Sequence, residues 1–172
     1  MFTKIDLCSM ALLKLGEKPI QSLREDSAKA QLARTLFDPT VDALLSLFPW
    51  RFATQNIMLN KTSEGDFIIP SNVLRVLKCD GKIIGNKIIN SADTTEIIAI
   101  VHKEPESFPG YFATLVATKL ALEFCVPLTG DTNIFNMMMA LYESEYQSAK
   151  FIDSTISNQT NIDNFSLINS RF

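Results

Sequence analysis

The sequence contains few of the residues from which catalytic and metal sites are built. Its 172 residues include one histidine and three cysteines, and Cys8, Cys79 and Cys125 lie far apart in apolar surroundings. An odd number of dispersed cysteines predicts reduced, buried thiols rather than a disulfide framework or a zinc site. The sequence also lacks a G-x-S-x-G motif, a glycine-rich phosphate loop and clusters with metal-ligand spacing. We therefore expect no enzyme activity, no cofactor and no metal.

The remaining polar candidates have ordinary structural explanations. His102 stands alone at the end of a predicted strand, where a surface residue or one with a satisfied partner is far commoner than a catalytic one. Glu104 and Glu106 are flanked by prolines in a predicted loop, which favours a helix-capping role. Three adjacent methionines, 137–139, cannot all face one way in a helix, so they predict a mixture of core and interface positions.

Excess positive charge is also missing. The formal net charge is -3, and lysines and arginines do not cluster along the chain. This argues against a broad surface that grips DNA. Lys4, Asp6 and Lys14 interrupt the apolar residues at the N-terminus, so that segment does not predict a signal peptide. We expect a protein made in a cytoplasm, with no membrane span.

Apolar residues at helical spacing predict four helices, over 4–15, 26–48, 108–126 and 132–152. Thr3 with Asp6 resembles a capping pair for the first helix, and Gly16 is its expected stop. Asp26 or Ser27 caps the second helix, and Asp131 or Thr132 the fourth. The pair 38–39, Asp-Pro, predicts a kink in the second helix or the start of a new segment. Pro127 is predicted to end the third helix.

Between the second and third helices the chain changes to β-branched residues and turn dipeptides. This predicts strands near 67–69, 73–79, 82–84, 87–89 and 95–101. The two short middle strands form a hairpin, the last strand closes the sheet, and Pro70 places the first at an edge or bend. The predicted fold is therefore mainly α: a four-helix bundle with a small antiparallel β module between helices 2 and 3, and an extended C-terminal tail.

The predicted domain covers residues 1–153, with the bundle at 1–56 and 105–153 and the β insertion at 57–104. Residues 154–172 form a C-terminal arm. Within the domain, Pro49 must end the second helix, and Trp50, the sole tryptophan, follows it between Phe48 and Phe52. We favour a core position for Trp50, because large aromatic side chains dominate core energetics. Contact with a neighbouring subunit is the alternative, and the two roles are compatible.

The order of four segments resembles one protein family. The stretch from Glu25 to Thr54, "EDSAKAQLARTLFDPTVDALLSLFPWRFAT", resembles the early region of the tail tubular protein A family, the head-to-tail adaptors (connectors) of short-tailed bacteriophages. "FIIPSNVLRVL" is similar to a later segment of that family, with Asn72 where an Asp is common. "FATLVATKLALEFCVPLTGD" and "LYESEYQSAKFID" are similar to its two closing helices. The matching elements of the first segment are Asp26, Ser27, Phe37, Asp38, Pro39, Leu44, Leu45, Pro49, Trp50, Phe52 and Ala53.

The resemblance, which covers roughly residues 3 to 153, implies a structural protein of the virion neck rather than a catalyst. Such proteins form a ring, thought of as dodecameric, that docks beneath the portal and carries the tail or nozzle protein below, while DNA passes through the channel without sequence-specific binding. The alternative is a monomeric intracellular helical binding module or chaperone-like bundle, with a ligand groove near the methionine-rich helix. Expected partner contacts are Trp50, Phe52, Asp80, Gly81, Gly85, Asn86, Phe165, Leu167, Ile168 and Phe172.

The C-terminal arm contains more apolar side chains than a spacer needs. Hydrophobic residues spaced along a polar segment are typical of chains that order on a partner. Phe165 and Phe172 are the predicted anchors. We expect the portal to be the arm's partner, and the adjacent adaptor subunit is the alternative.

Overall fold

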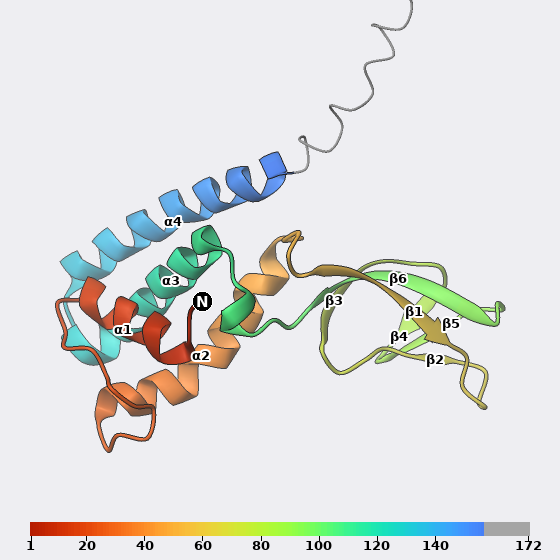
Figure 1. The fold of residues 1–172 in the computed structure, drawn as a ribbon, viewed down its shortest axis with the longest axis horizontal. Coiled ribbons are helices and arrows are strands. Elements are labelled where there is room, and N and C mark those ends of the chain that lie inside the picture. Colours follow the sequence, from red (N-terminus) through yellow and green to blue (C-terminus); the bar gives the residue numbers. More distant parts are fainter. Residues whose placement is uncertain (157–172) are drawn as a thin grey trace, which may run out of the picture.

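A computed structural model describes residues 1–156. The expectations for Phe165, Leu167, Ile168 and Phe172 therefore lie outside the described residues. Figure 1 shows a helical bundle on one side and a β module, residues 54–101, that projects from it. The four helices and the antiparallel β insertion between the second and third confirm the predicted fold class.

The helices are α1 (Lys4–Lys14), α2 (Ala28–Leu47), α3 (Gly110–Thr129) and α4 (Thr132–Thr155), with a short 3-10 helix η1 (Pro105–Ser107) before α3. Their starts follow local chemistry, because the first N–H groups of a helix need acceptors outside it. Thr3 and Asp6 form the predicted capping box, and Ser27 and Asp131 cap α2 and α4 through their side chains. Gly16, with φ of 75°, follows the end of α1 as expected.

The end predicted for the third helix was wrong, because α3 continues past Pro127 to Thr129. Of the two alternatives at residues 38–39, the start of a new segment was wrong, because Pro39 lies inside α2. The kink stays a prediction. Both prolines are exposed, and the carbonyls that lose their helical partners, four residues earlier, belong to the exposed Thr35 and the half-buried Glu123. Water can hydrate carbonyls on such faces, so burial of the opposite face holds each helix together despite the lost hydrogen bond.

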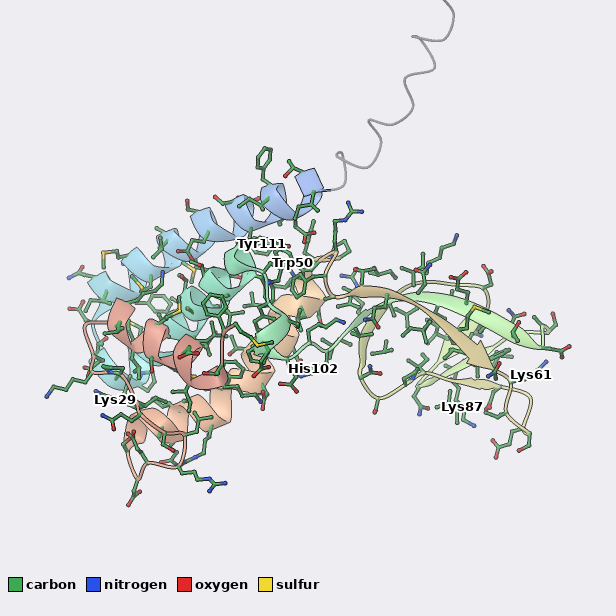
Figure 2. All side chains as sticks on the ribbon, in the orientation of Figure 1. Lys29, Trp50, Lys61, Lys87, His102 and Tyr111 are labelled. Atoms are coloured by element: carbon green, nitrogen blue, oxygen red, sulfur yellow. The ribbon has the colours of Figure 1, made fainter. Side chains whose placement is uncertain are left out.

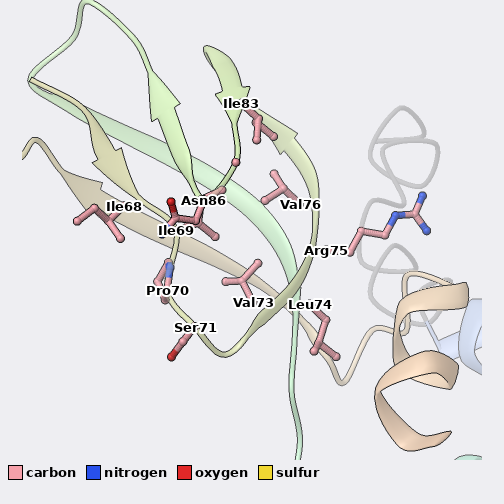
Figure 3. A pocket seen from close by; sticks show the side chains of 11 residues that line it. Ile68, Ile69, Pro70, Ser71, Val73, Leu74, Arg75, Val76, Ile83 and Asn86 are labelled. Atoms are coloured by element: carbon pink, nitrogen blue, oxygen red, sulfur yellow. The ribbon is translucent and has the colours of Figure 1, made fainter. Parts of the chain in front are cut away.

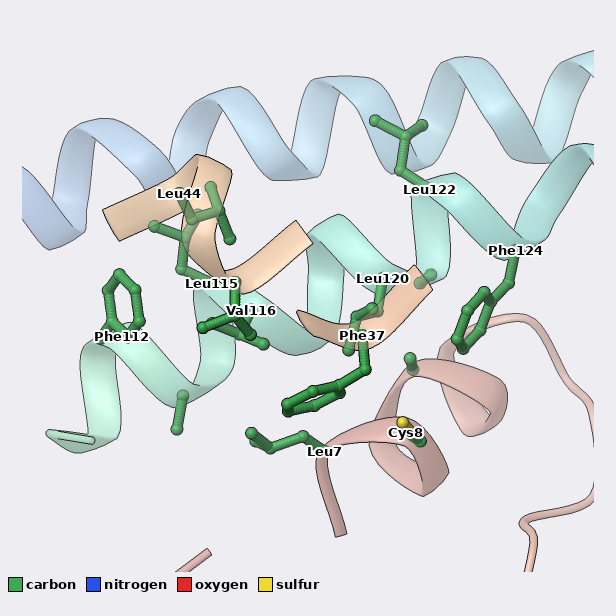
Figure 4. Packing of buried hydrophobic residues seen from close by; sticks show 14 of the residues in the cluster. Leu7, Cys8, Phe37, Leu44, Phe112, Leu115, Val116, Leu120, Leu122 and Phe124 are labelled. Atoms are coloured by element: carbon green, nitrogen blue, oxygen red, sulfur yellow. The ribbon is translucent and has the colours of Figure 1, made fainter. Parts of the chain in front are cut away.

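Helix α3 is the centre of the bundle, because it contacts α1, α2 and α4. Figure 4 shows its aromatic and aliphatic side chains packed between the other helices. Helix α3 is long and apolar enough to cross a membrane by length and composition, but 61% of that stretch is buried inside the protein. Burial of this extent is typical of a core helix, and the prediction of a central helix is confirmed.

The β module consists of two three-stranded antiparallel sheets. One sheet has the order β1 (Thr54–Asn60), β6 (Thr94–Val101), β3 (Val73–Cys79); the other has the order β2 (Phe67–Ile68), β5 (Lys87–Ile89), β4 (Lys82–Ile84). The β4–β5 hairpin and the edge position of β2 are confirmed. Strand β1 was missed by the sequence analysis. The expectation that the last strand closes the sheet was wrong, because β6 is the central strand between β1 and β3.

Strand β6 divides its side chains between two cores. Ile97 and Ala99 face a small core inside the module, together with Leu59, Phe67 and Ile88. Ile100 belongs instead to the core of the bundle. Because alternate residues of a strand point to opposite faces, one strand anchors the module to the bundle and also fills the module's own interior.

Candidate partner interface

The corner after α2 is built around Trp50. Its indole Nε1 donates a hydrogen bond to the Leu44 carbonyl oxygen over 2.9 Å, and its ring lies 4.9, 5.1 and 6.2 Å from the rings of Phe48, Phe112 and Tyr146. The exposed fraction of Trp50 is 0%. The core interpretation is therefore confirmed, and direct contact between this side chain and a partner would require it to leave its site.

Phe52 lies on the same corner but is only half-buried. Its ring centroid is 4.9 Å from that of Phe112 and 6.1 Å from that of Phe108. Phe52 thus belongs to the edge of the bundle core, and part of its surface stays accessible to a partner.

A buried carboxylate fixes the end of α4 to this corner. Asp153 accepts hydrogen bonds from the backbone N–H of Arg51, at 3.2 and 3.1 Å, and from the Tyr111 hydroxyl, at 2.6 Å. Figure 2 shows Trp50 and Tyr111 together at the corner, below the last turns of α4. Burial and the hydrogen bond to Asp153 raise the pKa of Tyr111 above its usual value. No sequence motif marked Asp153, because its partners lie about 40 and 100 residues away.

The module is fastened to the bundle by polar contacts near the end of α2. Arg75 on β3 donates to the Ser46 carbonyl oxygen at 3.0 Å, and the Val101 N–H donates to the Ala53 carbonyl oxygen at 2.9 Å. His102 Nδ1 lies 2.6 Å from an Asp42 carboxylate oxygen, so the histidine has a satisfied partner as predicted.

The predicted capping role of the two glutamates is not seen. Glu104 precedes η1 without a side-chain cap, and its carboxylate lies 3.6 Å from His102 Nε2. Glu106 is an exposed residue within η1.

The predicted turn residues lie at the two ends of β4 (Lys82–Ile84). Asp80 and Gly81 connect β3 to β4, and Gly85 and Asn86 connect β4 to β5. Gly81 has φ of 144°, and a Cβ there would lie 2.7 Å from the Ile89 carbonyl oxygen. This turn therefore requires glycine for both backbone conformation and space.

Gly85 and Asn86 also line a groove of about 610 Å³ between β3 and the β4–β5 hairpin (Figure 3). Most side chains along it are aliphatic, and we call this groove the seam. Its lining residues are Ile68, Ile69, Pro70, Ser71, Val73, Leu74, Arg75, Val76, Ile83, Gly85 and Asn86.

A second set of exposed apolar side chains lies where α2 and α4 end, near the Trp50 corner. Four large side chains there are strongly exposed, with Phe151 at 69%. We call this set the bundle end: Leu47, Phe151, Ile152 and Ile156. Exposed apolar side chains grouped at one end of a domain are typical of a surface that binds a partner.

The described residues offer little for catalysis. Across residues 1–156, no group of three or more His, Cys, Asp and Glu side chains is placed to hold a metal ion. All three cysteines are unbonded; Cys8 and Cys125 are buried and Cys79 is half-buried. Burial raises the pKa of the Cys8 thiol to about 12, which keeps it in the unreactive protonated form.

Comparison with models of protein families and with curated proteins gives no match to this chain. A functional conclusion therefore depends on this chain's own features, above all the seam and the bundle end.

Proposed function

We propose that this protein is a structural head-to-tail adaptor of a bacteriophage virion. In this role about twelve copies form a ring beneath the portal protein, bind the tail or nozzle protein below, and leave a channel for DNA. The protein is made in the host cytoplasm and ends in the neck of the virion. It acts by binding and not by catalysis.

The observation that carries this proposal is the presence of two different apolar surfaces on one chain. The bundle end presents Phe151 and its neighbours, whereas the seam presents Val76 and Ile83 on the β module. A ring of identical subunits needs such a pair, because each subunit contacts one neighbour through one patch and the next through another.

The segments that resemble the adaptor family also support the proposal. The first of them forms α2 and the Trp50 corner, the second forms β2 and β3, and the last two lie in α3 and α4. The first and the last two meet around Trp50, whose ring contacts Phe112 of α3 and Tyr146 of α4. The second is tied to α2 by the hydrogen bond from Arg75 to the Ser46 carbonyl oxygen. The matched residues thus build the joint between bundle and module, which sets how the two apolar surfaces are oriented.

The distribution of charge suits a channel through which DNA slides. The β module, residues 54–101, contains five basic and five acidic side chains. The described bundle has ten basic and thirteen acidic side chains. A surface without excess positive charge does not retain the phosphate backbone.

The test combines the full-length protein with portal rings from the same phage genome. Light scattering after size-exclusion chromatography gives the mass of the protein alone and of the mixture, and electron microscopy shows whether a ring sits on the portal. We expect a portal-bound ring, even if the protein alone is a monomer. Absence of binding to the portal would overturn the proposal and favour the monomeric binding module.

A matched pair of variants tests whether the bundle end forms the contact between subunits of the ring. Phe151→Glu changes an exposed residue of the bundle end, and Leu13→Glu changes a residue of α1 with similar exposure, 60%, that belongs to neither surface. We expect both variants to fold, and only Phe151→Glu to prevent ring formation. Equal assembly of the two variants would remove the bundle end from the interface.

A further inference from the structure

The two sheets of the β module are not joined along the seam. β3 is an edge of one sheet and β4 is an edge of the other, and the described strands include no ladder between them. On the opposite side of the module β1 lies against β2. The strands therefore surround the small core, and the seam is the gap between β3 and β4, although the Asp80–Gly81 turn connects these two strands directly.

Side chains along this gap face the core but lack a cover. Ile83 pairs directly with Ile88, which pairs with Phe67 on the next strand. Directly paired residues point to the same face of a sheet, and both Ile88 and Phe67 are fully buried. Ile83 is on that buried face, yet its exposed fraction is 44%. Figure 3 shows Ile83 and Val76 beside the open groove, with Val73 and Ile69 further along it.

The gap also exposes two strand edges. The outer edges of β3 and β4 carry backbone N–H and C=O groups that no strand within residues 1–156 pairs. Such edges bind extended segments by adding a strand, with main-chain hydrogen bonds for affinity and alternate side chains for specificity. An extended segment laid in the seam can pair with the edge of β3 and cover Ile83 and Val76.

The C-terminal arm has the composition for this role. Residues 162–168, Ile-Asp-Asn-Phe-Ser-Leu-Ile, place Phe165 and Leu167 two positions apart, hence on one face of an extended segment. No proline or glycine occurs in residues 154–172, so every residue there can donate to a ladder. Seven residues also match the length of β3, Val73–Cys79.

The arm is long enough to reach another subunit. It follows α4, whose end Asp153 holds at Arg51, and the sixteen residues 157–172 span about 53 Å when extended at ~3.3 Å each. A strand of seven residues takes about 23 Å of this length. The five residues from 157 to 161 remain as a connector of about 16 Å.

We propose that residues 162–168 of a neighbouring copy insert into the seam as an added strand between β3 and β4, with Phe165 and Leu167 packed over Ile83 and Val76. This inference rests on the proposed ring. Every chain there has one arm and one seam, so each arm fills the seam of the next subunit and the ring closes. It assigns Phe165 to the adjacent subunit, whereas the expectation from the family resemblance was the portal.

The first experiment uses a fluorescent peptide of residues 161–172 and the full-length protein, with binding followed by anisotropy. Two neighbouring exposed residues provide the matched variants: Ile83 lines the seam, and Ile84, with an exposed fraction of 51%, points to the other face of β4. We expect Ile83→Lys to weaken binding at least tenfold and Ile84→Lys to leave it unchanged. No binding, or equal effects of the two substitutions, would overturn the inference.

The peptide supplies a second control. A version with Phe165→Ser and Leu167→Ser keeps the length and formal charge of the peptide. We expect this version to lose binding at least tenfold. Equal binding of the two peptides would show that the apolar face does not carry the interaction, which contradicts the proposal.

The second experiment asks which chain supplies the arm. Copies with Ile83→Cys and copies with Leu167→Cys, distinguished by a mass tag, are assembled together on portal rings and oxidised. An interchain disulfide supports the inference. Rings without this disulfide overturn the inference but leave the ring proposal intact. A separate variant that carries both Ile83→Cys and Leu167→Cys is assembled and oxidised in the same way. A disulfide within its single chains, with none between the mixed copies, assigns the seam to the same chain's arm and also overturns the inference.

If no ring forms on the portal, the proposed function fails, and the assignment to a ring neighbour fails with it. The peptide experiment still decides whether the seam accepts the arm sequence, because it needs no ring. The two failures are therefore distinguishable.

Discussion

The bundle and the β module bury their apolar side chains to different extents. In the bundle, Trp50, Phe112 and Phe124 are fully enclosed by four helices. The module's own hydrophobic core has only five buried residues, and its core-facing Ile83 remains exposed along the seam. Small sheets are marginal by themselves and gain stability from a neighbour. The comparison indicates that the bundle folds on its own contacts, whereas the module is completed by a partner.

The largest expected effect comes from deletion of the β4–β5 hairpin, which tests whether the bundle folds without the complete module. Replacement of residues 80–90 by a short turn removes β4 and β5, and with them Ile88 from the module core. We expect the bundle to keep its helical circular dichroism and its cooperative unfolding, while assembly on portal rings is lost. Arg75 and Val101 still tie the remaining sheet to the bundle. Unfolding of the whole protein would show that bundle and module are one cooperative unit.

Trp50→Ala tests the closed core of the bundle. The side chain is fully buried and its Nε1 is hydrogen-bonded, so we expect a loss of about 3–5 kcal/mol in the free energy of unfolding, measured with urea. Phe151→Ala, on the exposed bundle end, is the control and should change stability by less than about 0.5 kcal/mol. A change within about 0.5 kcal/mol for Trp50→Ala, with assembly lost, would instead make Trp50 an interface residue.

Gly81→Ala tests the local stability of the β module. The positive φ and the close Ile89 carbonyl oxygen predict a local loss of about 1–3 kcal/mol, visible as faster amide exchange in β4 and β5. Gly110→Ala is the matched control in α3, because no atom lies within 4 Å of its added Cβ and its φ is ordinary. Equal exchange in the two variants would contradict the strain assigned to Gly81.

The smallest expected effect is a difference in alkaline stability. The folded-state pKa of Tyr111 is raised, so its contribution is present below the usual tyrosine pKa of ~10 and is lost as the pH rises through the folded value. The bundle should therefore lose stability above about pH 10. Tyr111→Phe should make that loss shallower in urea melts at increasing pH. An unchanged pH dependence would mean that Tyr111 does not contribute.

Much of the helical part follows from local chemistry. The side chains of Thr3, Ser27 and Asp131 mark helix starts, because each accepts a hydrogen bond from a backbone N–H a few residues ahead. The turn glycines 81 and 85 likewise predicted the β4–β5 hairpin. Such features depend on neighbours in the chain, which the sequence displays directly.

Other features depended on distant partners. Pro39 and Pro127 stay helical because the opposite faces of their helices are buried, which local rules do not register. Strand β1 exists through its pairing with β6, about 40 residues later. For the same reason Asp153, central to the corner, carried no signal in the sequence.

The amino-acid sequence by itself determined the mainly helical class, the insertion between the second and third helices, and the burial of a large aromatic residue at the Pro49–Trp50 corner. Capping, turn geometry and hydrophobic spacing are local properties, so the order of residues is sufficient to read them. Only the tertiary structure decided that β3 and β4, adjacent in the chain, are left unpaired around an open seam. Strand pairing is chosen by contacts across the whole module, and no single segment specifies them.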